Sequence, residues 1–323
     1  MYQKEGSEKG VQTIDTNSPK VAILMGTYNG ECFLPEQLDS IKRQTHTNWE
    51  LHVSDDGSTD STQAIINDFK AQLPEHQLTL RQGPKKGFAT NFLAITCDPC
   101  IKADYYAFSD QDDVWESDKL ERAIRWLRSI PADKPAMYCS RTRLIDENGN
   151  DAGFSPLFKR KPSFKNALVQ SIAGANTMVL NYSARMLIAK TGCETPIVSH
   201  DWWAYLLVSG CGGDIYYDPT PCIRYRQHGR NLVGSNVGWI ARQQRIIASF
   251  RGRFVDWNNT NISALQKLRN SLTEENRSLL SRFSEMRTWN PIKRTIAITR
   301  SGLYRQTTAG NTSLVFAAFI GKI

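Results

Sequence analysis

Five short strand-like runs, separated by stretches of helical periodicity, constrain the fold of this sequence more than any other feature. They are Val21–Met25, Glu50–Ser54, Leu78–Arg81, Tyr105–Phe108 and Ala136–Ser140. The first run is apolar at every position, which is typical of a strand buried on both faces. Between the first two runs, Leu34, Leu38 and Ile41 recur at helical spacing. Strands that alternate with helices predict an α/β fold with a doubly wound, mostly parallel sheet.

Beyond about residue 140 this alternation ends. Asp146–Gly149 has the composition of a turn and predicts a hairpin, 184–190 and 202–208 have helical patterns, and 214–227 is predicted to be extended. From Ile240 onward the pattern is helical and strongly basic. The whole chain carries a net charge of +8. This region holds 14 Lys and Arg against 4 Asp and Glu, so the basic character belongs to the C-terminal quarter.

The sequence offers little support for secretion or for a membrane-spanning segment. Residues 1–18 are polar and lack the apolar core of a secretory signal. The longest apolar run, Leu314–Ile320, is far shorter than a bilayer requires. The 7 cysteines are scattered, and the CxxC at Cys97–Cys100 has no second CxxC to complete a zinc site. We therefore expect a reducing, cytoplasmic compartment.

The loops after the first four predicted strands concentrate polar residues. They are Gly26–Gly30, Ser54–Asp60, Gly83–Gly87 and Ser109–Asp113. In an open α/β sheet, ligands bind outside the carboxyl ends of the strands, so these loops should meet at one edge. Together they supply glycines, hydroxyls, carboxylates and lysines, a set suited to nucleotide phosphates and to Mg²⁺ or Mn²⁺.

Each loop also has a simpler interpretation. Asp55–Gly57 is compatible with a turn before a helix cap, and Lys85–Lys86 with a solvated pair. Asp110, Asp112 and Asp113 could serve only the dipole of the following helix. The first loop matches neither a dinucleotide fingerprint nor a P-loop. The joint placement of the four loops favours a ligand site over four unrelated turns.

Taken together, the motifs resemble those of the family-2 glycosyltransferases of GT-A fold over roughly residues 20–234. The matching segments are VAILMGTYNGECFLPEQLDSI, ELHVSDDGSTDST, KKGFATNF, FSDQDDVWESDKL, SHDWW and YRQHGRNLVG. SDQDDVW with YRQHG is most similar to the bacterial rhamnosyltransferase branch, which acts on cell-surface polysaccharide. His200-Asp201 departs from the Glu-Asp of many relatives.

The resemblance implies a domain organisation. It predicts a disordered segment over 1–19 and a GT-A catalytic domain over 20–239. Within that domain, 20–140 would bind the nucleotide, and 141–239 would form a mixed acceptor half. The basic helical region over 240–323 would follow.

The resemblance also implies a divalent-cation site. Asp110-Gln111-Asp112 is similar to the DxD motif, in which Asp112 binds Mg²⁺ or Mn²⁺ and Asp110 lies near the metal or the ribose. His228 would be a further metal ligand or phosphate contact. The cation would neutralise the diphosphate that leaves. A structural role for His228 remains an equal alternative.

Donor and acceptor residues follow from the same resemblance. The predicted nucleotide-sugar ligands are Thr27, Tyr28, Asn29, Glu31, Asp55, Asp56, Lys86, Asn91, Asp110 and Gln111. Of these, Asp55 or Asp56 would accept from the pyrimidine N3–H. Asp201 would be the base that takes the acceptor proton, although from residues alone a helix cap is favoured. Asn176, Trp202, Trp203 and Arg226 are assigned to the acceptor or the sugar.

The basic C-terminal region has two interpretations. Its arginines are interleaved with apolar residues, as in a helix that lies on an anionic membrane. The residues are Arg242, Arg245, Arg251, Arg253, Ile246, Ile247, Phe250 and Phe254. The alternative is a helical cap packed on the catalytic domain. Nucleic-acid binding is not predicted, because no known module is visible.

The sequence therefore predicts a metal-dependent, inverting glycosyltransferase. It would move rhamnose from dTDP-rhamnose, or a hexose from a UDP-sugar, to a lipid-linked or cell-surface polysaccharide. A location on the inner face of the cytoplasmic membrane would suit that acceptor. Two alternatives are a sugar-nucleotide nucleotidyltransferase, whose basic first loop is missing here, and a non-catalytic glycan- or partner-binding protein on the same fold.

Overall fold

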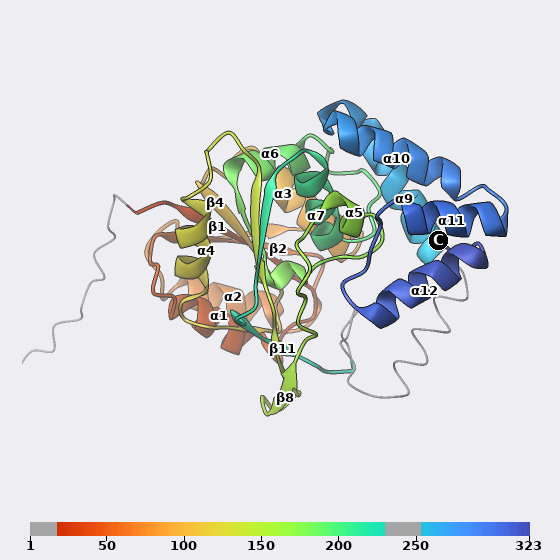
Figure 1. The fold of residues 1–323 in the computed structure, drawn as a ribbon. Coiled ribbons are helices and arrows are strands. Elements are labelled where there is room, and N and C mark those ends of the chain that lie inside the picture. The colour runs from red at the N-terminus through yellow and green to blue at the C-terminus, as the bar shows by residue number, and fades with distance from the viewer. Residues whose placement is uncertain (1–17, 230–252) are drawn as a thin grey trace, which may run out of the picture.

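A seven-stranded sheet forms the centre of the computed structural model, which describes residues 18–229 and 253–323 (Figure 1). The strand order is β10-β6-β9-β4-β1-β2-β3. The bounds are β1 Val21–Thr27, β2 Trp49–Asp55, β3 Leu78–Gln82, β4 Tyr105–Ser109, β6 Ala136–Ser140, β9 Val179–Asn181 and β10 Asp214–Asp218. β9 runs antiparallel to β4 and β6, and the other neighbouring strands are parallel. The predicted mostly parallel sheet is confirmed.

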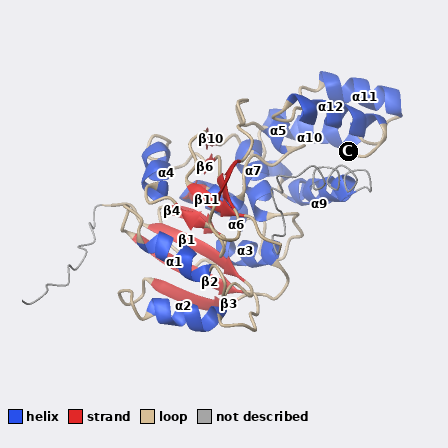
Figure 2. Cartoon of the chain, turned by 90° about the horizontal axis from the view of Figure 1, so that it is seen from below, coloured by secondary structure: helices blue, strands red, loops and turns tan. Residues whose placement is uncertain are grey.

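Helices cover both faces of this sheet, because successive residues of a strand point to opposite faces. Val21, Ile23 and Met25 of β1 pack into one core with α1, α2 and α4, and Ala22 and Leu24 into a second core with α3, α6 and α7. Figure 2 shows the strands with helices on either side. The bounds are α1 Leu34–Lys42, α2 Thr62–Lys70, α3 Phe88–Cys97, α4 Lys119–Leu127, α6 Tyr182–Ala189 and α7 His200–Gly210. Burial on both faces explains the continuous apolar run of β1.

A second, four-stranded sheet has the order β5-β11-β7-β8. Its strands are β5 Val114–Trp115, β7 Arg143–Ile145, β8 Asp151–Phe154 and β11 Ile223–Arg226. β7 and β8 form the predicted hairpin around Asp146–Gly149. β5 follows the acidic loop directly and pairs antiparallel with β11, more than 100 residues further along the chain. This pairing, which we did not predict, brings the acidic loop beside the chain that leads to His228.

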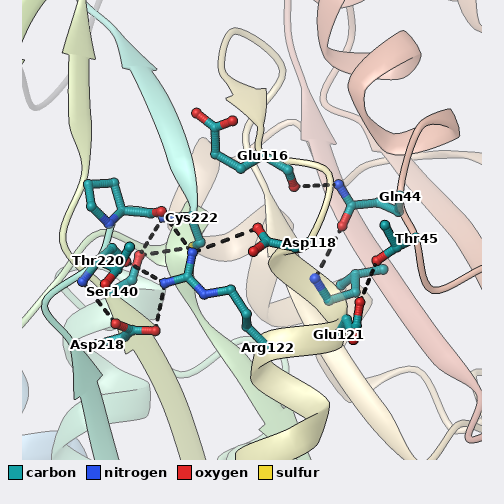
Figure 3. A network of polar contacts seen from close by, with 12 residues as sticks. Gln44, Thr45, Glu116, Asp118, Glu121, Arg122, Ser140, Asp218, Thr220 and Cys222 are labelled. Carbon is teal, nitrogen blue, oxygen red and sulfur yellow. Dashed lines mark hydrogen bonds and ion pairs between the residues drawn. The ribbon is translucent and has the colours of Figure 1, made fainter.

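Hydrogen bonds fix α4 on two sides (Figure 3). Arg122 of α4 donates to the Asp218 carboxylate (2.6 Å) and to the Thr220 carbonyl (2.7 Å), in the connection between β10 and β11. On the other side, Gln44 donates to the Glu116 carbonyl (2.8 Å) just before the helix begins. The segment after the acidic loop is thus held between the end of α1 and the approach to β11.

The described C-terminal region is helical, as predicted, and packs on the rest of the chain. Its helices are α9 Arg253–Lys267, α10 Glu274–Met286, α11 Pro291–Arg300 and α12 Thr308–Phe319, and the remaining short helices are α5 Phe164–Ala167, η1 Ala175–Thr177 and η2 Arg269–Ser271. Leu265 and Phe283 belong to the same core as Trp202 of α7. Asn276 donates to the Gly210 carbonyl at the end of α7 (3.0 Å). This packing supports the helical-cap interpretation.

Some predictions lie outside the described residues. They include the disordered segment, apart from residues 18 and 19, and the basic and apolar residues Arg242, Arg245, Arg251, Ile246, Ile247 and Phe250. The division at residues 19, 140 and 239 stays a prediction. Among the residues that the structure does describe, no helix is long and apolar enough to cross a bilayer.

Candidate active site

The loops after β1, β2 and β4 are joined by hydrogen bonds at one edge of the sheet. The Gln111 side chain, after β4, accepts from the backbone N–H of Tyr28 (2.8 Å) and donates to its carbonyl (2.9 Å). Asn29 accepts from the backbone N–H of Thr59, after β2 (2.9 Å). The backbone N–H and carbonyl of Tyr28 are thus held by Gln111, while the residue itself is 58% exposed.

The loop after β3 joins the same edge through Asp56. The Asp56 carboxylate accepts from the backbone N–H groups of Lys85 (2.7 Å) and Gly87 (2.8 Å). Lys86 lies between them, and its exposed ammonium is 3.2 Å from Glu194. An exposed ion pair of this kind contributes little to stability, so Lys86 can turn to another anion at small cost. The predicted convergence of the four loops is confirmed.

Asp55 is a structural carboxylate rather than an open acceptor. It is 1% exposed and accepts from the Thr27 hydroxyl, the Ser58 backbone N–H and the Gln63 amide, each at 2.9 Å. Burial alone would raise the pKa of Asp55, but hydrogen bonds from Ser58, Gln63 and Thr27 outweigh it and lower that pKa. Of the two carboxylates predicted to meet a pyrimidine, Asp56 is therefore the better placed.

In the acidic loop after β4, by contrast, the pKa values of two carboxyl groups are raised. Burial, with repulsion from Asp112 and Asp201, raises the pKa of Asp110 to about 7. Burial, with repulsion from Asp112 and Asp110, raises the pKa of Asp113 well above its usual range. Like charges this close favour protonation unless a cation lies among them. The loop therefore favours a bound positive charge.

His228 reaches this loop from the end of β11. Its Nε2 lies 2.8 Å from Oδ2 of Asp112, and its ring packs against Phe33 with centroids 4.8 Å apart. Asp112 and His228 are 116 residues apart in the sequence. The structure thus brings together two of the three predicted metal residues through a direct contact, and the third, Asp110, lies two positions from Asp112.

Arg226 forms hydrogen bonds with the acidic loop after β4. It is 2% exposed, and its guanidinium donates to the Asp112 carbonyl (3.1 Å), the Glu147 carbonyl (3.2 Å) and the Glu36 carboxylate. Its backbone N–H donates to Asp113 (3.2 Å). We predicted a contact with the sugar or acceptor. The structure instead makes Arg226 a positioning residue, because its guanidinium is buried among protein groups.

Asp201 lies in the first turn of α7, near the acidic loop. Its charge contributes to the raised pKa of Asp110, so the two carboxylates are close. Burial raises the pKa of Asp201 itself, although hydrogen bonds from Ser199 and Trp202 act against this. A carboxylate at the start of a helix suits a cap, yet a raised pKa also suits a proton acceptor.

Two predicted ligands are buried supports. Asn176 is 2% exposed and donates to the Asp113 carboxylate, so it orients the acidic loop. Asn91 is also 2% exposed and exchanges hydrogen bonds with the hydroxyl (2.6 Å) and carbonyl (2.8 Å) of Ser54 at the end of β2. Glu31 accepts from the Ser61 backbone N–H (3.0 Å) and is exposed, so it lies at the rim of the loops.

The tryptophan pair of α7 is part of the core. Trp202 is 5% exposed and donates to the Ala167 carbonyl (2.6 Å), whereas Trp203 is fully buried and donates to Thr191 (3.0 Å). These placements favour packing over the predicted stacking on a sugar. His200 stacks on Phe92 with centroids 3.9 Å apart, and burial lowers its pKa to about 3, so it stays neutral.

Sequence reasoning missed Lys119. This residue is fully buried, and its ammonium lies 3.2 Å from the centre of the Trp115 ring. Burial lowers its pKa to about 7, against the opposing charges of Cys222, Asp113 and Asp110. Lysine is rarely buried, so its place at the first position of α4 gave no signal. The preceding acidic cluster was the available clue, because a buried cation partly offsets that charge.

The acidic loop fits a divalent cation. Its carboxylates are crowded and short of positive charge, and Asp112 remains 18% exposed. Over the described ranges, no three His, Cys, Asp or Glu side chains form a ready-made metal cage. Mg²⁺ and Mn²⁺ that bind with nucleotides take one or two carboxylates from the protein and further ligands from phosphates and water. We therefore expect the protein alone to supply only some of the ligands of the cation.

Comparisons with known proteins agree with this arrangement. The family model described as glycosyl transferase family 2 matches residues 22–185. The dTDP-rhamnosyl transferase RfbG of Shigella flexneri is 31% identical over 230 residues, which are 69% of this chain and 78% of that protein.

Two solved structures share the fold. S. aureus TarS 1-349, in complex with UDP-GlcNAc, is similar with a TM-score of 0.52 and 17% identity, over 88% of this chain and 93% of that one. GalNAc-T7 with UDP, GalNAc and Mn²⁺ has a TM-score of 0.50 and 12% identity, over 66% of this chain and 45% of that one.

The fold and the site define a glycosyltransferase of GT-A architecture. The chain belongs to glycosyltransferase family 2, as its motifs predict, and it is similar to the rhamnosyltransferase RfbG. Membership of this family sets aside the nucleotidyltransferase and the non-catalytic binding protein as alternatives.

Proposed function

We propose that this chain is a metal-dependent, inverting glycosyltransferase that takes a sugar from a nucleotide-sugar with a pyrimidine base. One observation carries the proposal. The crowded carboxylates of Asp110 and Asp112, the His228 imidazole and the Asp201 carboxylate converge where four loops meet at the edge of the sheet. This set provides separate groups for a cation and for an acceptor proton.

Asp112, Asp110 and His228 would hold Mg²⁺ or Mn²⁺. When bound, such a cation supplies Lewis-acid help to the departure of the nucleoside diphosphate. Arg226 and Asn176 fix the backbone and the carboxylates of this loop, so the ligands are oriented before the donor arrives. The structure of GalNAc-T7, which contains UDP, GalNAc and Mn²⁺, shares the fold and is consistent with this assignment.

The donor's base and diphosphate would lie on the first three loops. The Tyr28 ring is exposed and its backbone is held by Gln111, which suits stacking on a base. Asp56 already accepts from the backbone N–H groups of Lys85 and Gly87, and we expect a remaining lone pair to accept from a pyrimidine N3–H. Lys86 would meet a phosphate. Thr27 and Asp55 would act beneath them by fixing the shape of the loop.

Asp201 would take the proton of the acceptor hydroxyl. It is close to Asp110, and burial raises its pKa, which makes it a stronger base than an ordinary carboxylate. If so, Asp201→Asn should bind donor as the wild type does but lose transfer by about 10²–10⁴-fold. The control is the melting temperature, since loss of a helix cap alone would lower stability without abolishing turnover. Retained turnover in a stable variant would assign Asp201 to capping.

The favoured donor is dTDP-rhamnose, because the similar protein RfbG is named a dTDP-rhamnosyl transferase. A UDP-hexose is the alternative, since uracil and thymine share the N3–H that Asp56 would recognise. A thermal-shift panel of dTDP-, UDP- and GDP-sugars, with and without Mn²⁺, separates them. We expect the largest Mn²⁺-dependent shift with dTDP-rhamnose. A larger shift with GDP-sugars would contradict a pyrimidine site.

The acceptor would be a lipid-linked or cell-surface polysaccharide, and the enzyme would work at a membrane surface. This part of the proposal is supported by the name of the similar rhamnosyltransferase and by the basic C-terminal region. Product analysis with purified lipid-linked glycan would test it, since a strict preference for soluble sugars would argue against such an acceptor.

A further inference from the structure

Apolar side chains gather at one corner of the C-terminal helices. Trp289 is 40% exposed, Ile292 70%, Phe319 53% and Ile320 37%. Trp289 and Ile292 lie at the turn into α11, and Phe319 and Ile320 lie at the end of α12. We call these four residues the C-terminal apolar corner. Figure 1 shows α11 and α12 at the side of the molecule away from the central sheet.

One buried arginine holds this corner together. Arg294 of α11 is 8% exposed and donates to the carbonyls of Trp289 (2.8 Å), Phe319 (3.1 Å) and Ala318. A single guanidinium therefore ties the turn before α11 to the last turn of α12. Because the backbone is fixed from inside, the four exposed side chains belong to one built surface rather than to two fraying ends.

The exposed positions on α11 and α12 also continue the apolar surface away from the corner. On α11, Ile296 is 47% exposed one turn after Ile292, while Arg294 and Ile298 are buried. On α12, Val315 is 39% exposed one turn before Phe319, while Leu314 and Ala318 are buried. Each helix thus has a buried face toward the protein and a second apolar stripe toward solvent, which is unusual for a helix on a protein surface.

The segment that carries these residues has charges of one sign. After Glu285 the chain has no acidic residue up to Ile323, whereas it has 6 basic ones. Lys293 follows Ile292, and Lys322 follows Ile320 by two positions. The Lys293 ammonium lies 6.0 Å from the centre of the Trp289 ring. Tryptophan and lysine beside aliphatic side chains is the composition found at the interface of a bilayer.

We propose that the C-terminal apolar corner inserts into the interface of an anionic phospholipid membrane, with Lys293 and Lys322 on lipid headgroups. A protein partner fits less well, because protein interfaces are depleted in lysine. This inference deepens the proposed function, since a lipid-linked acceptor would lie in the same membrane. It is independent of the residues that would bind the donor.

Vesicle co-sedimentation of the full chain, without donor or acceptor, tests the proposal. The vesicles are phosphatidylcholine alone, and phosphatidylcholine with about a third phosphatidylglycerol. We expect binding to the anionic vesicles, weakened but not abolished by salt. Ile292→Ser with Phe319→Ser should lower the partition coefficient by about tenfold or more. Both side chains are exposed, so the folded structure should persist, and circular dichroism checks this.

Phe154→Ser is the matched control. Phe154 is 50% exposed on β8, in the second sheet, and should leave vesicle binding unchanged. The proposal is overturned if the wild type ignores both vesicles, if the double variant binds as the wild type does, or if the corner instead drives self-association in sedimentation velocity. A Mn²⁺-dependent thermal shift with the donor is unaffected by any of these outcomes, so failure of the donor site would be seen separately.

Discussion

Two acidic loops at the same edge of the sheet differ in how their carboxylates are neutralised. In the loop after β2, Asp55 and Asp60 accept hydrogen bonds from hydroxyl and N–H groups nearby, and the pKa of each is lowered despite the cost of burial. In the loop after β4, burial and mutual repulsion raise the pKa of Asp110 and Asp113. Asp55 and Asp60 are therefore satisfied by donors near them, whereas the carboxylates of the loop after β4 still favour a positive charge.

The direction of the pKa shift distinguishes structural carboxylates from candidate ligand-binding carboxylates more clearly than the amino-acid composition does. Both loops have three carboxylates within a few residues, so both look alike in the sequence. A carboxylate that already accepts several hydrogen bonds has little left to offer a ligand. A crowded carboxylate whose pKa is raised by burial and repulsion, such as Asp110, gains most from a cation, which is the property expected of a metal-binding loop.

The largest expected effect is on kcat/KM, when one aspartate in each loop is replaced by asparagine. Asp112→Asn should lower kcat/KM by about 10³-fold or more, because it removes the carboxylate that would hold the cation on the diphosphate. Asp60→Asn, the matched control in the other loop, should change kcat/KM by less than about tenfold. Steady-state kinetics at saturating Mn²⁺ compares them.

Calorimetry sharpens this first comparison. Mn²⁺ with the nucleoside diphosphate should bind to Asp60→Asn as to the wild type, and should lose its binding heat with Asp112→Asn. Equal losses of activity in the two variants would mean that the loops do not differ in function, and the contrast drawn from their pKa values would be without consequence for catalysis.

A second, smaller effect is expected on the free energy of unfolding, which substitutions in the two loops should change in opposite directions. Asp55→Asn should reduce the free energy of unfolding by about 2 kcal/mol, because the amide nitrogen would face donors that the carboxylate accepts from. Asp110→Asn should raise it by about 1 kcal/mol in metal-free protein, because it removes one of the repelling charges. Urea unfolding with a chelator present measures both.

The comparison of the two loops would fail if both substitutions changed the free energy of unfolding in the same direction. If Asp110→Asn destabilised the metal-free protein as much as Asp55→Asn does, the carboxylate of Asp110 would be held by favourable contacts, and the loop after β4 would be a structural turn like its neighbour. Activity would not be needed to reach that conclusion.

The sequence predicted the central sheet well, and the physical reason is periodicity. Strands buried on both faces, such as VAILM, and helices with one apolar face leave patterns that local reasoning can recover. The rule that ligands bind at the carboxyl ends of strands predicted that the four loops would meet. Gln111 after β4 contacts Tyr28 after β1, and Asp56 after β2 contacts Gly87 after β3.

The second sheet and the roles of buried polar residues could not be predicted. β5 is two residues long and pairs with β11 from more than 100 residues away, so no local pattern indicates it. The resemblance assigned Arg226 to the acceptor or the sugar. Its burial follows from the pairing of β11 with β5 and β7, which places it behind Asp112. Tertiary context decided these roles.

The smallest expected effect is a pH dependence that again distinguishes the two loops. The pKa of Asp110 is about 7 in the folded protein, against about 3.9 when unfolded. Between these values the folded state binds the extra proton, so the free energy of unfolding of metal-free protein should fall as pH rises from about 4 to about 7. The lowered pKa of Asp55 acts in the other direction. Its stabilisation is present above about pH 4 and is lost as pH falls through its folded pKa.

Because Asp110 is partly exposed, we expect the fall to reach only about 1–2 kcal/mol. Urea unfolding between about pH 5 and pH 8 with a chelator measures it, and subtracting the Asp110→Asn curve isolates this carboxyl from the histidines. Saturating Mn²⁺ with nucleoside diphosphate should stabilise the wild type more than Asp110→Asn, because the variant lacks one of the carboxylates that would hold the cation. Parallel curves in the metal-free state would show that Asp110 is ionised at little cost, and the loop after β4 would then resemble the loop after β2 in its electrostatics as well as in its sequence.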